Sequence, residues 1–238
     1  DFSGAGLNDI TLEMNSIILS GSVNQLTRSM TFSSLMIEGK VQFDRNCVEN
    51  RRDNVDRIAI ALLYSSHRGE ILKLGDGVIF SNNCVLGVDN RSARGGVLLN
   101  SSISPITIGD HAVFSGNYAF SNLNGAFGGV FYSARHRSVG MGFHGEIAVG
   151  ANATFINNYA FSDSGNAFGG VIYSDADISF SDGATFINNY AKTSGGAIEL
   201  AGKLDLLALT KDVLFSGNMT GGVFTRHDDG TFSVENGV

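Results

Sequence analysis

A short motif, Phe-x-x-Asn, recurs along the chain and constrains its fold more than any other feature. Its copies read FDRN, FSNN, FSGN, FINN, FINN and FSGN, and they begin at Phe43, Phe80, Phe114, Phe155, Phe186 and Phe215. After most copies comes a Gly-Gly pair with an apolar run, as in GGVFY from Gly128 and GGAIE from Gly195. A third, alternating segment precedes the next phenylalanine, as in GEIAVGAN from Gly145. Such a fixed period indicates a repeat architecture.

Each repeat of roughly 30 residues supplies three short strands that cannot bury their apolar faces alone. We therefore predict an all-β fold, a right-handed parallel β-helix of about seven three-stranded rungs, in which like strands of successive rungs pair in parallel. A single domain is expected over residues 1–238. Its first rung, residues 1–40, is atypical. Its last rung, residues 221–238, is expected to be open, because no polar cap follows it.

The period assigns a role to each repeated residue. The phenylalanines are expected to form one inward stack along the axis, and the Gly-Gly pairs to supply positive φ angles or close backbone approach. Asparagine tolerates left-handed backbone and its amide can bond to copies above and below, so a ladder at one corner is expected. The ladder residues are Asn46, Asn83, Asn117, Asn158, Asn189 and Asn218. A further corner is expected at Asp76, Asp110, Asn152, Asp182 and Asp212.

Composition narrows the function classes. The chain has 31 Gly, 1 Pro and a formal net charge of -7, and no stretch sustains the period of a long helix. This acidic balance gives no broad basic surface for nucleic acid, so no nucleic-acid partner is expected. No apolar run is long enough for a membrane-spanning helix. No histidine and cysteine cluster has metal-ligand spacing, so neither a metal nor a cofactor is expected.

Cys47 and Cys84 each follow a ladder asparagine, in adjacent repeats. In-register neighbours lie within the distance that a disulfide requires. The alternative is two stacked thiols that act as small apolar side chains.

Two near-identical segments, AFSNLNGAF (119–127) and AFSDSGNAF (160–168), are inserted between asparagine and Gly-Gly. They are expected to stack as a ridge that carries Phe120, Phe127, Phe161 and Phe168. As an exposed ridge, these rings are the candidate for partner binding. The alternative is that the rings fold back and cover the corner.

A longer basic segment, residues 133–146, interrupts one rung and contains Arg135, His136 and Arg137. Long segments on rigid solenoids often carry recognition, so contact with an anion or acidic glycan is one interpretation. A solvated loop is the other.

Catalysis on this fold would require carboxylates clustered on one outward strand face. The nearest material is Asp175, Asp177, Glu199 and Asp205. Glu199 falls in the column of Tyr132 and Tyr173, whereas Asp177 and Asp205 fall in the next strand. Their phases do not align, so no catalytic residue is predicted.

The alternation of Phe-x-x-Asn with Gly-Gly-[Ala/Val]-[Ile/Leu/Phe] resembles the tandem motif of polymorphic outer-membrane proteins of chlamydiae and related autotransporter passengers. The resemblance covers roughly residues 40–225, and FINNYAKTSGGAI from Phe186 fits it best. It implies a secreted, surface-displayed β-helix, usually an adhesin, that attaches to the outer membrane only through a separate anchor domain. The sequence would then be a passenger fragment or a processed product.

We expect a non-enzymatic, extracellular or bacterial cell-surface protein that binds a surface protein or glycan of a host or neighbouring cell. One alternative is a structural subunit of a filament or sheath that associates end to end. Another is a polysaccharide lyase or hydrolase.

Overall fold

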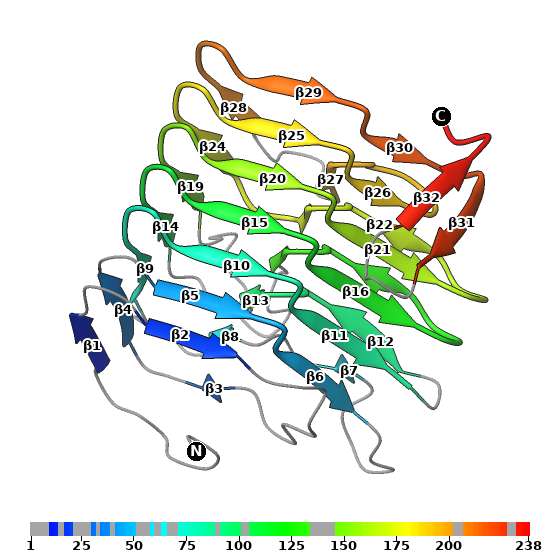
Figure 1. Cartoon of the computed structure of the whole chain (residues 1–238), viewed down its shortest axis with the longest axis horizontal. Helices are drawn as coiled ribbons and strands as arrows, with labels where there is room; N and C mark the ends of the chain where they lie inside the picture. Colours follow the sequence, from blue (N-terminus) through cyan, green and yellow to red (C-terminus); the bar gives the residue numbers. More distant parts are fainter. Residues whose placement is uncertain are drawn as a thin grey trace, which may run out of the picture.

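The chain forms a stack of short parallel strands (Figure 1). The computed structural model describes residues 10–13, 17–20, 30–31, 34–38, 41–50, 58–59, 63–65, 71–88, 91–100, 105–133, 146–201, 207–227 and 232–238. Within these residues it contains strands and no helix. Strands from successive turns pair in parallel, with one exception at the C-terminal end of the described chain. The prediction of an all-β parallel β-helix is confirmed.

Three core sheets enclose the main hydrophobic core. The first holds β1 (Ile10–Glu13), β4 (Ser34–Glu38), β9 (Ile71–Leu74), β14 (Ile106–Ile108), β19 (Ile147–Val149), β24 (Ile178–Phe180) and β28 (Leu207–Leu209). The second holds β2 (Ile17–Ser20), β5 (Val41–Asp44), β10 (Ile79–Ser81), β15 (Val113–Ser115), β20 (Thr154–Ile156), β25 (Thr185–Ile187) and β29 (Leu214–Ser216). The third holds β3 (Met30–Thr31), β8 (Leu63–Ser65), β13 (Leu98–Asn100), β18 (Phe131–Ser133), β23 (Ile172–Ser174) and β27 (Ile198–Leu200).

Two projecting sheets pack against each other beside this body and form a lateral projection. The first projecting sheet holds β6 (Cys47–Asn50), β11 (Cys84–Gly87), β16 (Tyr118–Ser121), β21 (Tyr159–Ser162), β26 (Tyr190–Ala191) and β30 (Met219–Thr220). The second holds β7 (Ile58–Ala59), β12 (Ser92–Arg94), β17 (Ala126–Phe127) and β22 (Ala167–Phe168). Small buried side chains, among them Val85, Ala119, Ala126 and Ala160, fill the space between the two sheets.

The turns from β4 to β23 therefore contain five strands each, where the sequence predicts three. The three predicted strands are the walls of the core. The segment between asparagine and Gly-Gly adds two more, because its copies at 118–127 and 159–168 are long enough to pair in register with each other. In the shorter copy that follows Asn189, a single bridge between Phe168 and Ser194 continues the second projecting sheet.

A stack of phenylalanine rings runs through the main core. Phe155 and Phe186 pair in register on parallel strands, with ring centroids 4.7 Å apart and planes 7° from parallel. The same column continues with Phe114 on one side and Phe215 on the other. Five of its rings are buried: Phe43, Phe80, Phe114, Phe155 and Phe186. The repeated phenylalanine thus fills the core at every turn.

The ladder asparagines form a continuous chain of buried hydrogen bonds. Asn158 Oδ1 accepts from the backbone N–H of Asn117 at 3.0 Å and from Asn117 Nδ2 at 3.1 Å. Asn158 Nδ2 donates to the Phe114 carbonyl oxygen at 2.9 Å and to Asn189 Oδ1 at 3.1 Å. The same pattern recurs at Asn83, Asn117 and Asn189, all fully buried. Each amide therefore satisfies backbone groups that the bend would otherwise leave unpaired.

The left-handed backbone lies one residue before the ladder, so its predicted place was wrong. The third residue of each motif has the positive φ angle, for example 56° at Asn157 and 52° at Asn188. This residue reverses the chain, which frees the following asparagine to direct its amide inward. The further corner is shifted in the same way. Asp76, Asp110 and Asp182 share one position, whereas Asn152 and Asp212 lie one position later, where the φ angles are positive.

Residues 221–238 differ from the predicted open parallel rung. β31 (Val223–Arg226) and β32 (Phe232–Glu235) pair antiparallel and lie against the first projecting sheet. The ring of Phe224 lies 4.5 Å from that of Phe161 and 5.0 Å from that of Tyr190. These aromatic contacts partly cover the apolar side of the hairpin, which packs against the tyrosine cluster.

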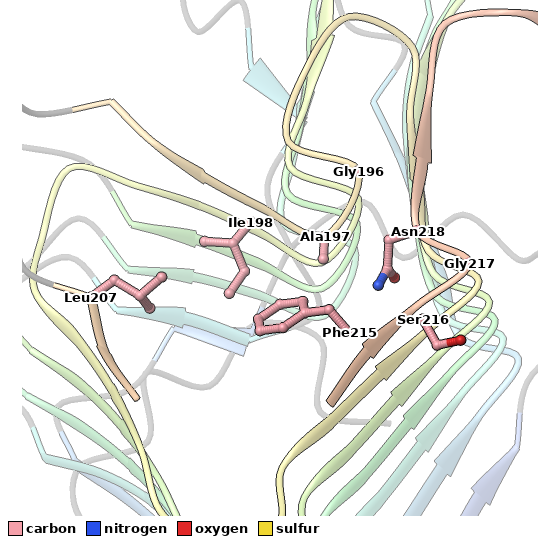
Figure 2. A pocket seen from close by; sticks show the side chains of 8 residues that line it. All are labelled: Gly196, Ala197, Ile198, Leu207, Phe215, Ser216, Gly217 and Asn218. Atoms are coloured by element: carbon pink, nitrogen blue, oxygen red, sulfur yellow. The ribbon is translucent and has the colours of Figure 1, made fainter. Parts of the chain in front are cut away.

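The core is open at the end formed by β27 to β30. Gly196, Ala197, Ile198, Leu207, Phe215, Ser216, Gly217 and Asn218 line a hollow of about 390 Å³ there (Figure 2). The side chains of Leu209, Leu214 and Phe215 are exposed at this end. End-to-end association through it stays a prediction.

Candidate binding surface

The four phenylalanines proposed for binding lie on the lateral projection, as two in-register pairs. Phe120 and Phe161 stack on the first projecting sheet with ring centroids 6.1 Å apart. Phe127 and Phe168 stack on the second projecting sheet at 5.7 Å. All four rings are half-buried. Phe120 and Phe161 pack against one hydrophobic cluster, whereas Phe127 packs against another and Phe168 stacks on Phe127, so the structure does not bring the four rings into one ridge.

The first pair joins a stack of tyrosines. Tyr118 and Tyr159 are parallel to within 3°, at 4.7 Å, and Tyr190 continues their column. The β31–β32 hairpin covers part of this cluster, because Phe224 contacts Phe161. Tyr118 and Phe120 belong to the same cluster at the neighbouring turn. This aromatic face is therefore already partly occupied by the chain itself.

The second pair faces two tyrosines of the third core sheet. Tyr132 and Tyr173 are parallel to within 4°, at 5.4 Å. Phe127 contacts Tyr173 edge to face at 5.1 Å, and Phe168 lies 6.1 Å from the same ring. Two stacked columns thus meet outside the main core, with Tyr132 buried and Phe127, Phe168 and Tyr173 half-buried.

The Gly-Gly turns bring these columns together. Gly128 has a φ of 65°, a conformation in which glycine has no Cβ penalty. A Cβ on Gly129 would collide with the carbonyl oxygens of Gly170 and Tyr159, so the second glycine is required for close stacking of turns. The residue before each pair consequently lies beside the residue four places after the first glycine, as Phe127 lies beside Tyr132.

Charged groups lie at both ends of the two columns. The Arg94 guanidinium lies over the Tyr132 ring at 5.0 Å and the Phe127 ring at 5.8 Å. Glu199 is the in-register neighbour of Tyr173, and its Oε2 accepts a hydrogen bond from Ser194 Oγ at 2.9 Å. Burial raises the pKa of the Tyr173 hydroxyl above its ordinary value, and the carboxylates of Asp175 and Glu199 raise it further. The tyrosine therefore stays protonated beside two negative charges.

Sequence reasoning considered Asp175 and Glu199 only as catalytic candidates and did not identify Arg94, Tyr132 or Tyr173 as part of a surface. The signal was present as a constant spacing of five across each Gly-Gly pair. It joins Arg94 to Leu99, Phe127 to Tyr132, Phe168 to Tyr173, and Ser194 to Glu199. Knowing that both members of a pair lie side by side outside the main core required the geometry of the turn.

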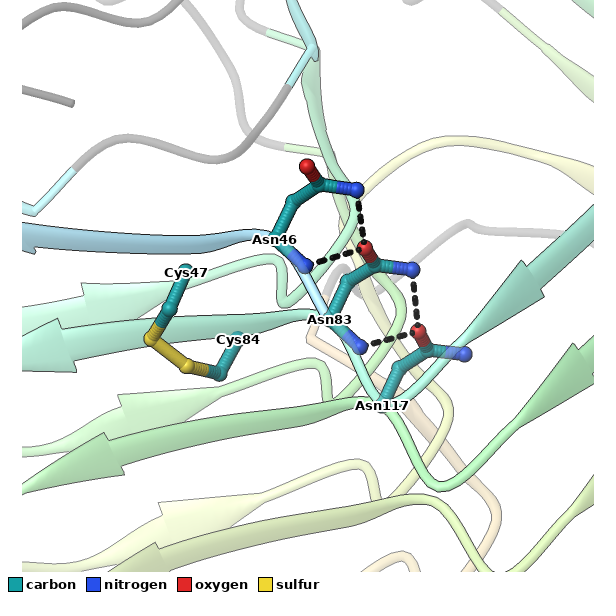
Figure 3. The surroundings of a disulfide bond; sticks show 5 residues. All are labelled: Asn46, Cys47, Asn83, Cys84 and Asn117. Atoms are coloured by element: carbon teal, nitrogen blue, oxygen red, sulfur yellow. Dashed lines mark hydrogen bonds between the residues drawn. A yellow bond between two sulfur atoms is a disulfide. The ribbon is translucent and has the colours of Figure 1, made fainter. Parts of the chain in front are cut away.

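Cys47 and Cys84 form a disulfide between adjacent turns (Figure 3). Their Cα atoms are 4.4 Å apart, both residues are 3% exposed, and they occupy the column of Tyr118 beside the ladder. The bridge closes a loop across a sequence separation of 37 residues. By loop-closure entropy, such a link stabilises a fold by about 3–4 kcal/mol.

Several other candidate residues are not part of this surface. Arg135, His136 and Arg137 lie outside the described residues, as does Asp205. Asp177 is exposed and precedes β24 of the first core sheet, whereas Glu199 lies on β27 of the third. Among the described residues, no three histidine, cysteine, aspartate or glutamate side chains gather as a metal site would require. No helix in the described part of the chain could cross a membrane.

The fold defines a class of protein, the parallel β-helix repeat proteins. Residues 183–200 match the family model of the Chlamydia polymorphic membrane protein repeat. The matched stretch contains one FINN motif and the following Gly-Gly pair, and the match confirms the resemblance stated for the motifs. That family is associated with the outer membrane and the cell surface. No curated protein and no solved structure matches the chain.

Proposed function

We propose that this chain is an extracellular, adhesin-like β-helix that binds a surface protein or glycan of a host or neighbouring cell through its lateral projection. The observation that carries the proposal is the regular stacking of half-buried aromatic rings on the outside of a rigid solenoid. Half-buried rings retain contact area and lose little conformational entropy on binding. The same contact recurs at successive turns, which favours multivalent attachment.

Two further observations support this role. The matched repeat comes from a family of surface-associated proteins. The buried disulfide between Cys47 and Cys84 suits an oxidising, extracellular compartment.

Replacing Phe120, Phe127, Phe161 and Phe168 by serine is expected to reduce adhesion of the labelled chain to cultured animal cells at least tenfold, because aromatic anchors supply most of the binding energy of such surfaces. Cell-bound fluorescence measures this. The β-sheet circular dichroism should persist, because the main core holds none of these rings. Leu209→Ser with Leu214→Ser is the control, since both side chains are exposed away from the projection. Undiminished adhesion of the phenylalanine variant, or equal loss in the control, contradicts the assignment.

A further inference from the structure

Two columns joined by the Gly-Gly turns form a strip outside the main core. One column is Arg94, Phe127, Phe168 and Ser194, and the facing column is Leu99, Tyr132, Tyr173 and Glu199, with Asp175 beside them. Leu99 and Tyr132 are buried, whereas Phe127, Phe168, Tyr173 and Glu199 are partly exposed. In-register pairing fixes the order along the axis. The strip therefore runs from a cation, across two aromatic rows, to a carboxylate. Successive rows are separated by one strand spacing of about 4.8 Å.

Asp175 and Glu199 place negative charge at one end of the strip. Within the described part of the chain, neither Asp175 nor Glu199 takes part in an ion pair. Asp175 Oδ1 is buried and has no hydrogen-bond donor. Glu199 and Tyr173 are only partly buried, so part of each side chain is accessible to solvent. Carboxylates held beside aromatic ring faces favour a cation, because both present negative potential.

At the opposite end of the strip, the same two aromatic columns already hold a cation, that of Arg94. The Arg94 guanidinium contacts the rings of Phe127 and Tyr132, one from each column. Phe168 and Tyr173 are the in-register copies of these two rings. Phe127 and Tyr132 have Arg94 as their charged neighbour. Phe168 and Tyr173 instead have the carboxylates of Asp175 and Glu199 as theirs.

We propose that the end of the strip formed by the later turns, with Phe168, Tyr173, Asp175 and Glu199, is a subsite for a basic side chain of a partner protein. An arginine or lysine of the partner lies on the two rings and pairs with Glu199, while Asp175 adds to the negative potential. This rests on the proposed adhesive function for its biological use and names the chemistry of the partner. A neutral glycan would use the rings without needing either carboxylate.

The probe is a capped tetra-arginine peptide, titrated into the full chain by calorimetry at low and at physiological salt. Glu199→Gln keeps the size and the hydrogen-bonding capacity of the side chain and removes its charge, and binding should weaken about tenfold. Phe168→Leu keeps apolar volume and removes the ring, and binding should weaken about threefold. Binding should also weaken with added salt.

Glu146→Gln is the matched control. Glu146 also accepts a hydrogen bond from a serine hydroxyl, that of Ser179, but it is exposed beside the first core sheet. Its replacement removes the same charge and should leave peptide binding unchanged.

Equal weakening by both glutamine variants would overturn the subsite, since it would mean general attraction to an acidic protein. Absence of binding to the native chain, or binding of cellotetraose in place of the peptide with no dependence on Glu199, would also overturn it. None of these outcomes bears on the cell-adhesion result, which measures the whole projection. Loss of adhesion on phenylalanine replacement without peptide binding would leave the proposed function standing and remove this subsite alone.

Discussion

Phe155→Ala is expected to lower the free energy of unfolding by about 3–5 kcal/mol. The ring is fully buried and stacks between Phe114 at 5.0 Å and Phe186 at 4.7 Å. It also meets Phe131 and Phe180 edge to face. Removing it leaves a cavity in the middle of the column. The flanking turns cannot close the gap, because the strand that carries Phe155 stays hydrogen-bonded between them and holds them apart. Urea unfolding followed by circular dichroism measures the loss.

Phe215→Ala is the control in the same column. Phe215 stacks on Phe186 at 4.6 Å but is 44% exposed at the open end of the core. Its replacement should cost about 1–2 kcal/mol, since less area leaves contact and no closed cavity forms. If the two variants lost equal stability, the phenylalanine column would not be the core of the solenoid.

Asn158→Ala is expected to cost about 3–5 kcal/mol, although no apolar contact of comparable size is lost. The substitution removes the acceptor for the Asn117 N–H and the donor to the Phe114 carbonyl, both inside the fold. A buried polar group without a partner costs about 1–3 kcal/mol, and this change leaves at least two of them. Because the ladder is continuous, the loss should reach both neighbouring turns. Hydrogen exchange should show faster exchange at Asn117 N–H as well as reduced global stability.

Asn166→Ala provides the comparison, because Asn166 is an exposed asparagine of the projection. It should change stability by no more than about 0.5 kcal/mol. A ladder variant as stable as the Asn166 variant would show that the amide chain does not stabilise the bends.

The strands and core residues that recur with one period were predicted from the sequence. The strands in segments whose length differs from repeat to repeat were not. The repeated Phe155 and Phe186 predict the stacking correctly, because a shift of register by one residue would move one of these buried rings to the surface. The left-handed residue was misplaced by one, because asparagine occupies both positions in FINN and composition alone does not separate them. The stacking of 118–127 on 159–168 was predicted from their similar sequences. That each segment forms two strands was not predicted, because these strands are stabilised by pairing with the neighbouring copy and not by local propensity.

The candidate surface was predicted in part. Phe120, Phe127, Phe161 and Phe168 were identified from two copied segments, but their division into two clusters depends on which side of a projecting sheet each ring occupies. Arg94 was missed because its role arises from Tyr132, five residues away across a glycine turn. The antiparallel hairpin within residues 221–238 was also missed. Its Phe224 contacts Phe161 and Tyr190, and these aromatic contacts compete with the parallel pairing that the sequence of this segment favours.

The central claim is that like segments of successive turns lie parallel and in register, and paired cysteines test it most directly. Thr154 faces Thr185, and Ile156 faces Ile187, on adjacent parallel strands. Oxidation should cross-link Thr154→Cys with Thr185→Cys, and Ile156→Cys with Ile187→Cys. Thr154→Cys with Ile187→Cys should stay reduced, because residues two places out of register are roughly 8 Å apart, beyond disulfide reach. Peptide mapping reads the links, and preferential bridging of 154 to 187 would contradict the parallel register.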